Sequence, residues 1–413
     1  MLRVAEAQAI VQQHAQPLSP ETVPLTSAAL GLVLAEDVAS DLDMPPYDKA
    51  LMDGFAVRSS DLADGHGILT IIDEITAGQT PRLPIGPGQA ARIMTGAPIP
   101  VGADAVVMIE HTQALQGSRV QVHDKPPTPG QNVLPQGREF RQGETVLPAG
   151  TIVRPQEFGI LSTVGRSTIR VYPRPDVAVL STGDEVVEAS QTPGPGQIRN
   201  GNGPMLLAQV CRAGGLPHFL GIARDHRESL RPLVEEGLHH PILVLSGGVS
   251  AGKLDLVPGV LQELGVQTHF HKVEMKPGKP VFFGTRAQTL VFGLPGNPVS
   301  ALVCFELFVG PAVRRQMGHA EPGPHLVEAA LADDFAYRTD RPTYYPARLD
   351  PNSDSWRVRP VLWFGSADLR ALAQANALVL FPSGDHKYRA GQVVYVLPLD
   401  FELPSPHTQR IAK

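Results

Sequence analysis

Three apolar runs decide the fold of this chain: ILVLSGGVSAGKLDLV (242–257), HFHKVEMKPGKPVFFG (269–284) and LVFGLPGNPVSALVCFEL (290–307). Each run is interrupted abruptly by glycine, serine, lysine or asparagine. Buried parallel strands have this pattern where they leave a sheet, and in open α/β sheets the loops at that edge hold the ligand. The residues at these breaks are Ser246, Gly247, Gly248, Lys276, Lys279, Gly296 and Asn297. Together they predict a cradle for an anion, such as a phosphate group.

The surrounding sequence alternates strands and helices. PDVAVLSTGDEVVE (175–188) contains a buried strand over 177–180, and GNGPMLLAQVCRAGG (201–215) predicts a helix with Asn202 near its cap, Pro204 in its first turn and Gly214 at its exit. DHRESLRPLVEEGLHH (225–240) predicts a second helix, opened by a capping box from Asp225 to Glu228. Residues 174–318 are therefore expected to form an α/β domain with a mostly parallel sheet.

The flanking segments have other patterns. Residues 4–16 and 154–165 have helical spacing, whereas 44–141 contains short strands between Gly/Pro turns. Beyond Pro322 five further strand patterns and one helix, SADLRALAQA, predict a small barrel. We expect a multidomain α/β plus β protein, with an α+β linker and dimerisation domain (1–43 plus 142–173), an inserted β domain (44–141), the α/β domain (174–318) and a C-terminal β-barrel domain (324–404).

Composition narrows the class of protein. The 413 residues are 42% hydrophobic and 18% charged, which supports packed cores. A formal charge of −6 without a local basic patch argues against nucleic acid or an anionic membrane as partner. Only Cys211 and Cys304 occur, each in a helical segment, and no run is long enough to span a membrane. A soluble, cytoplasmic protein is the simplest expectation.

Two lysines, Lys276 and Lys279, stand on either side of a Pro-Gly turn, which suits a di- or triphosphate but also an ordinary solvated turn. Asn297 and Pro298 place a helix start at the third exit, with free N–H groups to bind a ligand. SGGVSAGKLD (246–255) lacks Walker spacing, so it does not indicate an ATPase. Its Ser250 is a second donor to phosphate.

Carboxylates follow the same strand exits. Glu185 lies in the turn STGDE and Asp255 precedes a helix, where it serves either as a cap or as a Mg²⁺ ligand. Asp53 and Gly54, in isolation, indicate a plain turn. His269 and His271 alternate on a strand, which favours a polar sheet face over a metal site. No GxSxG motif indicates a triad hydrolase.

Taken together, several stretches resemble the molybdopterin molybdenumtransferase family, which includes bacterial MoeA and the E domain of animal gephyrin. The stretches are PPYDKALMDGFAVR, IMTGAPIPVGADAVVMIE, VLSTGDEVVE, GQIRNGNGPML, LSGGVSAGKLDLV, MKPGKPVFFG, VFGLPGNPVSA and GSADLRALAQANALVLFPSG. They extend from about residue 44 to 384. The combination is specific to the family, although motifs similar to SGGVS and PGNP also occur in related pterin-binding domains.

The resemblance implies an elongated homodimer of four-domain subunits with a MogA-like central domain. It implies insertion of molybdate into adenylylated molybdopterin, with Mg²⁺-dependent release of AMP, and a molybdopterin adenylyltransferase as a partner. The residues that match catalytic and metal-binding acids are Asp53, Glu185 and Asp255. With the strand exits, the expected substrate-binding set is Thr95, Ser246, Gly247, Gly248, Ser250, Lys276, Lys279, Pro295, Gly296, Asn297, Arg348 and Ser366. In the family, the stretch around Asp53 faces the α/β domain of the partner subunit.

The sequence also departs from the family pattern. Lys49, Ala50 and Leu51 replace the usual residues of the PPFDNSAMDGYA motif, and Glu139 stands where Asp is typical. Further departures are Asn200 in place of an acid, Arg199 in place of an aromatic residue, and Pro241 where an acid often precedes the SGG strand. Losing two anionic groups is expected to weaken Mg²⁺ binding or to favour a different pose of the bound ion.

The resemblance favours a molybdenum-inserting transferase. A second hypothesis is a paralogue that binds or scaffolds the pterin without turning it over. A third is adenylyl transfer, or cleavage of another nucleotide's pyrophosphate bond, by the same α/β domain. Release of AMP separates the first hypothesis from the second, and ATP-dependent release of pyrophosphate identifies the third.

Overall fold

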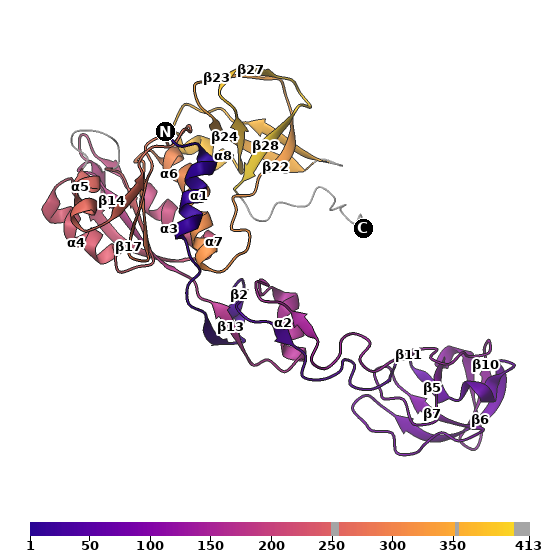
Figure 1. Ribbon diagram of the computed structural model, residues 1–413. Helices are drawn as coiled ribbons and strands as arrows, with labels where there is room; N and C mark the ends of the chain where they lie inside the picture. Colours follow the sequence, from indigo (N-terminus) through magenta and orange to yellow (C-terminus); the bar gives the residue numbers. More distant parts are fainter. Residues whose placement is uncertain (249–255, 352–354, 400–413) are drawn as a thin grey trace. The chain divides into compact units, whose positions relative to one another are not determined.

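The computed structural model describes residues 1–248, 256–351 and 355–399, and the chain divides into two compact units (Figure 1). The first unit comprises Met1–Val23, Gly31–Ala35 and Arg170–Lys413, and the second comprises Pro24–Leu30 and Glu36–Ile169. The predicted fold class is confirmed, because the first unit holds an α/β sheet and a closed barrel and the second is rich in β structure. The finer four-domain division stays a prediction.

A six-stranded sheet forms the centre of the first unit, in the order β17-β14-β18-β21-β20-β19. The strands are β14 (Asp176–Thr182), β17 (Leu216–Ala223), β18 (Ile242–Ser246), β19 (Gln267–Phe270), β20 (Phe282–Arg286) and β21 (Thr289–Leu294). β17, β14, β18 and β21 pair in parallel, whereas β20 is antiparallel to both β21 and β19. The expected mostly parallel sheet is thus observed.

Helices cover both faces of this sheet. α4 (Arg227–Gly237) and α5 (Leu256–Glu263) bury apolar side chains in one cluster with Ala178 and Leu180 of β14. α3 (Asn202–Ala213) lies on the opposite face (Figure 1) and ends at Gly214, whose φ of 98° suits glycine. The sheet is therefore buried on both sides, as its continuous apolar strands require.

The predicted capping box at the start of α4 is wrong. The helix begins one residue later than a cap at Asp225 requires, and His226 is the cap, since its Nδ1 accepts a hydrogen bond from the backbone N–H of Ser229 at 3.3 Å. Asp225 instead donates its backbone N–H to the Asp184 carboxylate at 3.1 Å. Asp225 therefore lies outside the helix, before its cap.

A helical segment follows β21: α6 (Pro298–Cys304), the π-helical turn η4 (Phe305–Val309) and α7 (Gly310–Gln316). Buried Glu306 of η4 accepts a hydrogen bond from Gln209 Nε2 and pairs with Arg212, both on α3. Burial raises the pKa of Glu306, although the nearby Arg212 opposes this. The polar cluster anchors α3 to η4, and α1 (Val4–His14) packs against η4 and α7.

The C-terminal part contains the predicted closed barrel, ordered β22-β25-β24-β26-β28. Its strands are β22 (Val327–Leu331), β24 (Thr343–Pro351), β25 (Trp356–Pro360), β26 (Ala377–Phe381) and β28 (Val393–Pro398). β23 (Phe335–Thr339) and β27 (Gly384–Tyr388) form a separate antiparallel pair, and α8 (Leu369–Gln374) is the expected helix. Phe381, Tyr345 and Val379 belong to the barrel core.

Short elements complete the first unit. β2 (Val33–Leu34) pairs with the end of β13 (Thr168–Tyr172), and β15 (Val186–Val187) pairs with β16 (Ile198–Arg199). β1 (Glu21–Pro24) lies at the boundary of this unit, and η1 (Ser27–Ala29), which follows it in the chain, belongs to the second unit. Among the described residues, no helix is both long and apolar enough to cross a membrane.

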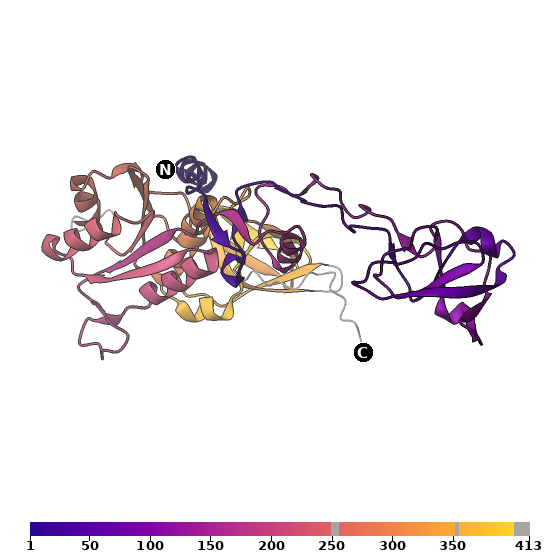
Figure 2. The same cartoon turned by 90° about the horizontal axis from the view of Figure 1, so that it is seen from below.

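A six-stranded sheet also organises the second unit, in the order β8-β5-β7-β6-β10-β9. Figure 2 shows the strands of this unit in indigo to purple. Its strands are β5 (Gly54–Val57), β6 (His66–Ile75), β7 (Gln89–Ile93), β8 (Ala105–Met108), β9 (Thr112–Leu115) and β10 (Arg119–His123). Phe55 and Val57 enter one apolar cluster and Ala56 enters another, so this sheet is buried on both faces. The other elements are β3 (Val38–Ala39), β4 (Lys49–Ala50), η2 (Ser59–Leu62), η3 (Ile109–His111), β11 (Val133–Leu134), β12 (Thr145–Leu147) and α2 (Pro155–Thr163).

Strand β5 begins at Gly54, where the sequence in isolation suggested only a turn. Its neighbours β7 and β8 flank it closely, and a Cβ on Gly54 would lie 1.9 Å from the carbonyl oxygen of Val107. Glycine is therefore required here by the close approach of another backbone rather than by a turn. The strand directly follows Asp53, so it fixes where that carboxylate leaves the sheet.

We expect Gly54→Ala to lower the free energy of unfolding of the second unit by about 1–3 kcal/mol or more, because the added methyl group overlaps the Val107 carbonyl. Gly159→Ala is the matched control, since Gly159 lies in α2 with no atom near its absent Cβ. It should stabilise the unit by about 0.5–1 kcal/mol. Thermal and urea unfolding of both variants measure the effect, and equal stabilities would contradict it.

Candidate functional site

The register of three neighbouring strands creates the candidate site. Ser181 of β14 pairs with Ser246 of β18, and Ser246 pairs with Leu294 of β21. The three strands thus end at almost the same level, and the turns that follow them lie side by side. This is the edge at which open α/β sheets hold ligands.

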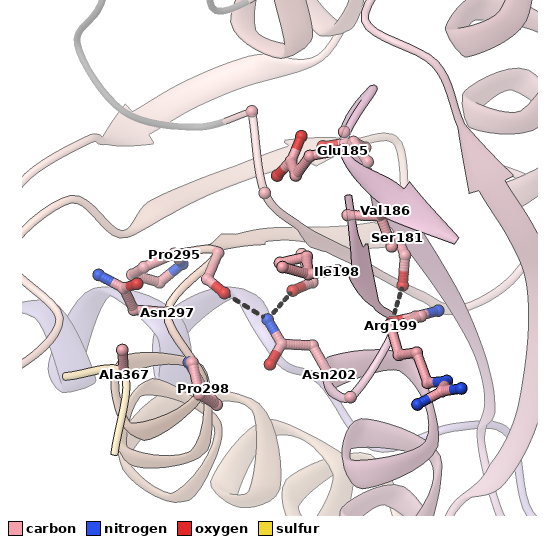
Figure 3. A pocket seen from close by; sticks show the side chains of 18 of the residues that line it. Ser181, Glu185, Val186, Ile198, Arg199, Asn202, Pro295, Asn297, Pro298 and Ala367 are labelled. Atoms are coloured by element: carbon pink, nitrogen blue, oxygen red, sulfur yellow. Dashed lines mark hydrogen bonds between the residues drawn. The ribbon is translucent and has the colours of Figure 1, made fainter. Parts of the chain in front are cut away.

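A cavity of about 720 Å³ lies at this edge (Figure 3). Its lining residues are Ser181, Thr182, Gly183, Glu185, Val186, Ile198, Arg199, Asn200, Gly201, Asn202, Asp225, Ser246, Gly247, Gly248, Pro280, Pro295, Gly296, Asn297, Pro298, Ala367 and Leu369. They include seven residues of the predicted site, namely Glu185, Ser246, Gly247, Gly248, Pro295, Gly296 and Asn297.

Gly247 and Gly248 form the turn after β18 with φ values of 99° and 62°. A Cβ on Gly247 would lie 2.5 Å from the Thr182 carbonyl oxygen, and one on Gly248 would lie 2.9 Å from the Thr182 hydroxyl. Both the conformation and the close approach exclude larger residues. The turn therefore exposes backbone, rather than side chains, to the cavity.

The hydroxyl of Thr182 lies beneath this glycine turn. Thr182 is 4% exposed, and its Oγ1 has no hydrogen-bond partner among the described residues. Buried polar groups are nearly always paired, so an unused one beside a cavity needs an explanation. A hydroxyl and a glycine cradle at one place fit the oxygen atoms of an anionic ligand.

Asn202, at the start of α3, connects two of the turns. Its Nδ2 donates to Ser246 Oγ at 2.9 Å and to the Gly296 carbonyl at 2.7 Å, as Figure 3 shows. The sequence pattern predicts Asn202 near a helix cap, but its side chain forms hydrogen bonds across the cavity floor. Since α3 is anchored through Glu306, this bridge ties the floor to the helical layer.

The turn that carries Glu185 is held by Arg224, which the sequence did not single out. Arg224 Nη1 donates to the carbonyls of Asp184 at 2.9 Å and Val186 at 3.1 Å. The exposed Glu185 carboxylate and Asp225 both border the cavity. Asp225 follows strand β17, and the only sequence signal for its place in the site is the general rule that polar residues are common where parallel strands end.

Asn200 stands in place of an acid and is 6% exposed. Its Oδ1 accepts hydrogen bonds from the Ser181 hydroxyl at 3.1 Å and the backbone N–H of Gly203 at 2.9 Å. The side chain therefore fastens the start of α3 to the end of β14. Its Nδ2 has no partner among the described residues.

The start of α6 contacts the C-terminal part of the chain. Asn297 Nδ2 donates to Ser366 Oγ at 3.0 Å, and the backbone N–H of Val299 donates to the Ser366 carbonyl at 3.0 Å. Asn297 occupies the cap position without capping the helix by its side chain. The expectation of free N–H groups at this helix start thus needs correction, because Ser366 occupies one of them.

The lysine turn 276–280 borders two cavities. Pro280 lines the first, whereas Lys276 lines a second cavity with Arg338, Thr339, Asp340, Gly384 and Asp385. The backbone carbonyl of exposed Lys279 accepts hydrogen bonds from the N–H groups of Val273 and Val281, and its ammonium makes no ion pair with any residue the structure describes. Thus Lys276 does not join Ser246 in the first cavity.

The remaining predicted residues lie elsewhere. Arg348, on β24, forms an ion pair with Asp350 at 3.2 Å and lines neither cavity. Asp53 and Thr95 belong to the second unit. Ser250 and Asp255 lie outside the described residues.

Asp53 and Thr95 contact each other within the second unit. The backbone N–H of Thr95 donates to Asp53 Oδ1 at 2.6 Å and the Thr95 hydroxyl donates at 2.7 Å. These two bonds, the backbone one foremost, lower the pKa of Asp53. The carboxylate is thus held ionised in a fixed direction.

Three departures from the family pattern have structural explanations. Lys49 Nζ and Glu139 Oε1 lie 3.7 Å apart and form an ion pair, so the two unusual residues neutralise each other. Pro241 immediately precedes β18 and lies at the opposite end of that strand from Ser246. The expectation that Pro241 removes charge from the site is therefore wrong.

Metal binding by protein residues alone receives little support. In the described ranges, no group of three or more His, Cys, Asp or Glu residues could hold an ion. His269 bonds to Thr285 at 2.8 Å and stacks on His14. The polar-face interpretation of His269 therefore fits better than a metal site.

The fold and cavity define a multidomain α/β protein with a cavity at a sheet edge, and comparisons with known proteins specify its class. Residues 2–165 match the MoeA N-terminal region (domains I and II), 178–315 a probable molybdopterin binding domain, and 328–399 the MoeA C-terminal region (domain IV).

Individual proteins agree with these matches. The chain is 36% identical over 371 residues to the molybdopterin molybdenumtransferase of Bacillus subtilis, covering 88% of this chain and 86% of that protein. It is 34% identical to the Staphylococcus aureus protein of the same name, covering 94% and 93%. The crystal structure of a molybdopterin biosynthesis MoeA protein from Pyrococcus horikoshii superposes with a TM-score of 0.81 at 32% identity, covering 97% and 99%. The chain belongs to the molybdopterin molybdenumtransferase family.

We expect Thr182→Val to leave the free energy of unfolding unchanged or raise it by up to about 1 kcal/mol, because it removes a buried hydroxyl without a partner. The adjacent Ser181→Ala is the matched comparison, since that hydroxyl donates to Asn200 and its loss should cost about 1 kcal/mol. Urea unfolding measures both. A destabilised Thr182→Val would show that the hydroxyl is paired within the protein.

We expect Thr95→Val to raise the pKa of Asp53 but to leave it below the ordinary value, because the backbone N–H still donates. A lowered pKa stabilises the fold above the pKa of the unfolded chain, and this contribution is lost as the pH falls through the folded-state pKa. The variant should therefore lose less stability on acidification. Carboxyl ¹³C NMR titration measures the shift, with Thr95→Ser as the control; identical titration curves for wild type and Thr95→Val would refute it.

Proposed function

We propose that this chain inserts molybdate into adenylylated molybdopterin, with Mg²⁺-dependent release of AMP, during molybdenum cofactor biosynthesis. The observation that carries the proposal is similarity along nearly the whole chain to proteins named molybdopterin molybdenumtransferase. All three matched regions belong to one such architecture. A pterin-binding module alone would not require the flanking regions.

The chemistry of the first cavity supports this proposal. The substrate carries phosphate groups, and the cavity offers a glycine turn, the unpaired Thr182 hydroxyl and Ser246. Oxygen atoms of a phosphate accept hydrogen bonds from such groups. Within this proposal, Lys276, Lys279, Arg348 and Ser366 contact anionic parts of the substrates, molybdate included.

Mg²⁺ fits the donor chemistry of the cavity. This ion prefers oxygen ligands and is commonly held by one or two carboxylates together with substrate phosphates. Glu185 and Asp225 supply two carboxylates on one cavity, and Asp255 completes the proposed acid set. When bound, Mg²⁺ would neutralise charge on the pyrophosphate link as it breaks.

We further propose a homodimer in which Asp53 and Thr95 of one subunit complete the cavity of the other. An ionised Asp53 held by Thr95 suits that role, because its carboxylate needs no rearrangement to bind a metal ion. A molybdopterin adenylyltransferase would supply the substrate. The cytoplasm is the proposed location, in keeping with two free cysteines that form no disulfide.

The test is to incubate purified protein with adenylylated molybdopterin, molybdate and Mg²⁺ and to measure AMP by chromatography. We expect AMP release that depends on both molybdate and Mg²⁺, and a product that activates a cofactor-free molybdenum enzyme. Glu185→Gln should lower the rate about 10- to 100-fold, the scale of losing one charged contact. Glu188→Gln, an exposed residue near the same turn, is the control and should leave the rate unchanged.

Each alternative has its own outcome in this experiment. Tight pterin binding without AMP release, where a reference enzyme releases AMP, would overturn the transferase proposal in favour of a binding or scaffolding protein. Release of pyrophosphate that requires ATP would instead indicate adenylyl transfer.

A further inference from the structure

The lysine turn is held in place by the C-terminal part of the chain. The backbone N–H of Lys276 donates to the Pro342 carbonyl at 2.9 Å, and the Lys276 carbonyl accepts from the Tyr344 N–H at 2.8 Å. Lys276 thereby forms a parallel bridge with Thr343, the first residue of β24. Both backbone groups of Lys276 are committed to one partner segment, so the position of that segment sets the position of the lysine.

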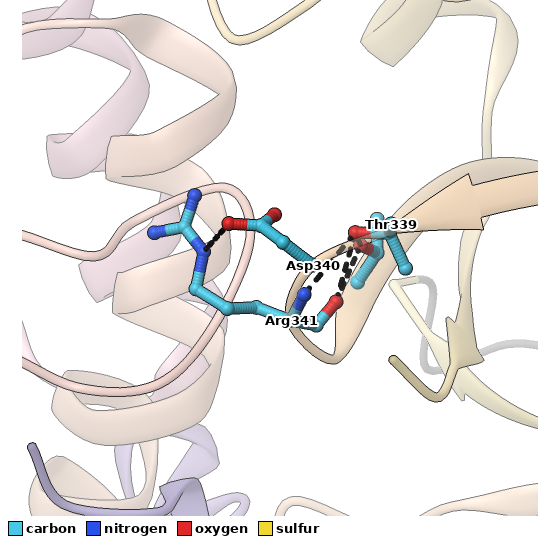
Figure 4. Close-up of polar contacts among 4 residues, drawn as sticks. Thr339, Asp340 and Arg341 are labelled. Atoms are coloured by element: carbon cyan, nitrogen blue, oxygen red, sulfur yellow. Dashed lines mark hydrogen bonds and ion pairs between the residues drawn. The ribbon is translucent and has the colours of Figure 1, made fainter. Parts of the chain in front are cut away.

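That partner segment, the turn 339–343, is locked by two buried hydroxyls (Figure 4). Thr343 is 0% exposed and Thr339 is 7% exposed, and their Oγ1 atoms lie 2.9 Å apart. Each also lies within hydrogen-bond distance of the Arg341 carbonyl, at 2.9 Å from Thr339 and 3.1 Å from Thr343. The two hydroxyl groups thus take part in three contacts, one with each other and one each with the Arg341 carbonyl. All three contacts lie within the same turn.

The Lys276 side chain emerges beside this turn. Its Nζ lies 5.6 Å from the centroid of the Tyr337 ring, within the range of a cation–π contact. It lines the second cavity with Thr339, while Asp340 of the turn pairs with Arg341 at 3.1 Å. The pair of threonines thus fixes both the backbone of Lys276 and the wall against which its side chain rests.

We propose that Thr339 and Thr343 are positioning residues for Lys276, holding its ammonium where it meets an anionic group of the substrate. The inference rests on the proposed function for the identity of that substrate. Lys276 has four flexible side-chain bonds, so a mobile backbone would spread its charge over many positions. Fixing the backbone from both sides restricts that spread before the substrate arrives, which strengthens binding by preorganisation.

The experiment uses the full-length protein and compares two variants. Thr343→Val removes the hydroxyl, whereas Thr343→Ser keeps it. Thr289→Val is the matched control, because the Thr289 hydroxyl donates to the Leu238 carbonyl at 3.2 Å at the opposite end of β21 from the cavity. We expect Thr343→Val to speed hydrogen exchange at the amides of Lys276 and Tyr344 about 10-fold, while the other two variants match wild type. Thr339→Val provides a second test should Thr343→Val fail to fold.

Kinetics then separate positioning from mere structural damage. Thr343→Val should raise the KM for adenylylated molybdopterin about 10-fold, the scale of one charge-assisted contact, with kcat unchanged. In a Lys276→Met background the same substitution should change KM by less than about 2-fold, since the group it positions is gone. Additive effects in the two backgrounds, or faster exchange without a change in KM, would overturn the proposal.

A binding measurement, which needs no catalytic turnover, tests the positioning role of Thr339 and Thr343 separately from the proposed function. Calorimetry with inorganic pyrophosphate should show the same pattern of affinities across the variants. If wild type binds pyrophosphate in this pattern but releases no AMP, the proposed function fails and the positioning role stands. If wild type does not bind pyrophosphate, or binds it equally in all variants, the positioning role is overturned.

Discussion

The register of β14, β18 and β21 is the constraint on which the site depends. Ser181, Ser246 and Leu294 pair across three parallel strands, so the turns after them start at one level. A slip of one residue would exchange the two faces of a strand and bury its polar exit. Because both faces of this sheet are packed against helices, the apolar cores on either side hold the register in place. The cavity is thus a consequence of packing in the sheet below it.

Much of the fold followed from apolar patterning alone. Most residues of Ile242–Ser246 and Thr289–Leu294 are apolar, which is typical of a strand that is buried on both faces. The glycine-rich exits predicted the turns, because only glycine tolerates the φ values of Gly247 and Gly248 beside Thr182. Local rules succeeded for these strands and turns, whereas the capping box predicted at Asp225 was wrong.

Interactions between distant parts of the sequence were not predictable in this way. Gly54 suggested a turn because the approach of Val107 is invisible in the sequence. Asn202 was expected near a cap, yet it bonds to Ser246 and Gly296, 44 and 94 residues away. The direction of Lys276 depends on β24, which follows it by more than 60 residues. Seven of the predicted residues line the first cavity, whereas the partner of each side chain could not be predicted.

The Asn200 departure shows how a site can lose charge without losing shape. Its structural task needs only an acceptor, since Oδ1 receives the Ser181 hydroxyl and the Gly203 N–H, and Asn and Asp both offer one. A second carboxylate oxygen at the Nδ2 position would be a buried charge without a described partner, which is more costly than a buried amide. The amide therefore keeps α3 fastened to β14 while lowering the negative charge around the cavity. With less negative charge, the cavity repels phosphate less but also binds a cation more weakly. Among the described residues, Glu185 and Asp225 are then the carboxylates of the cavity that could bind a metal ion.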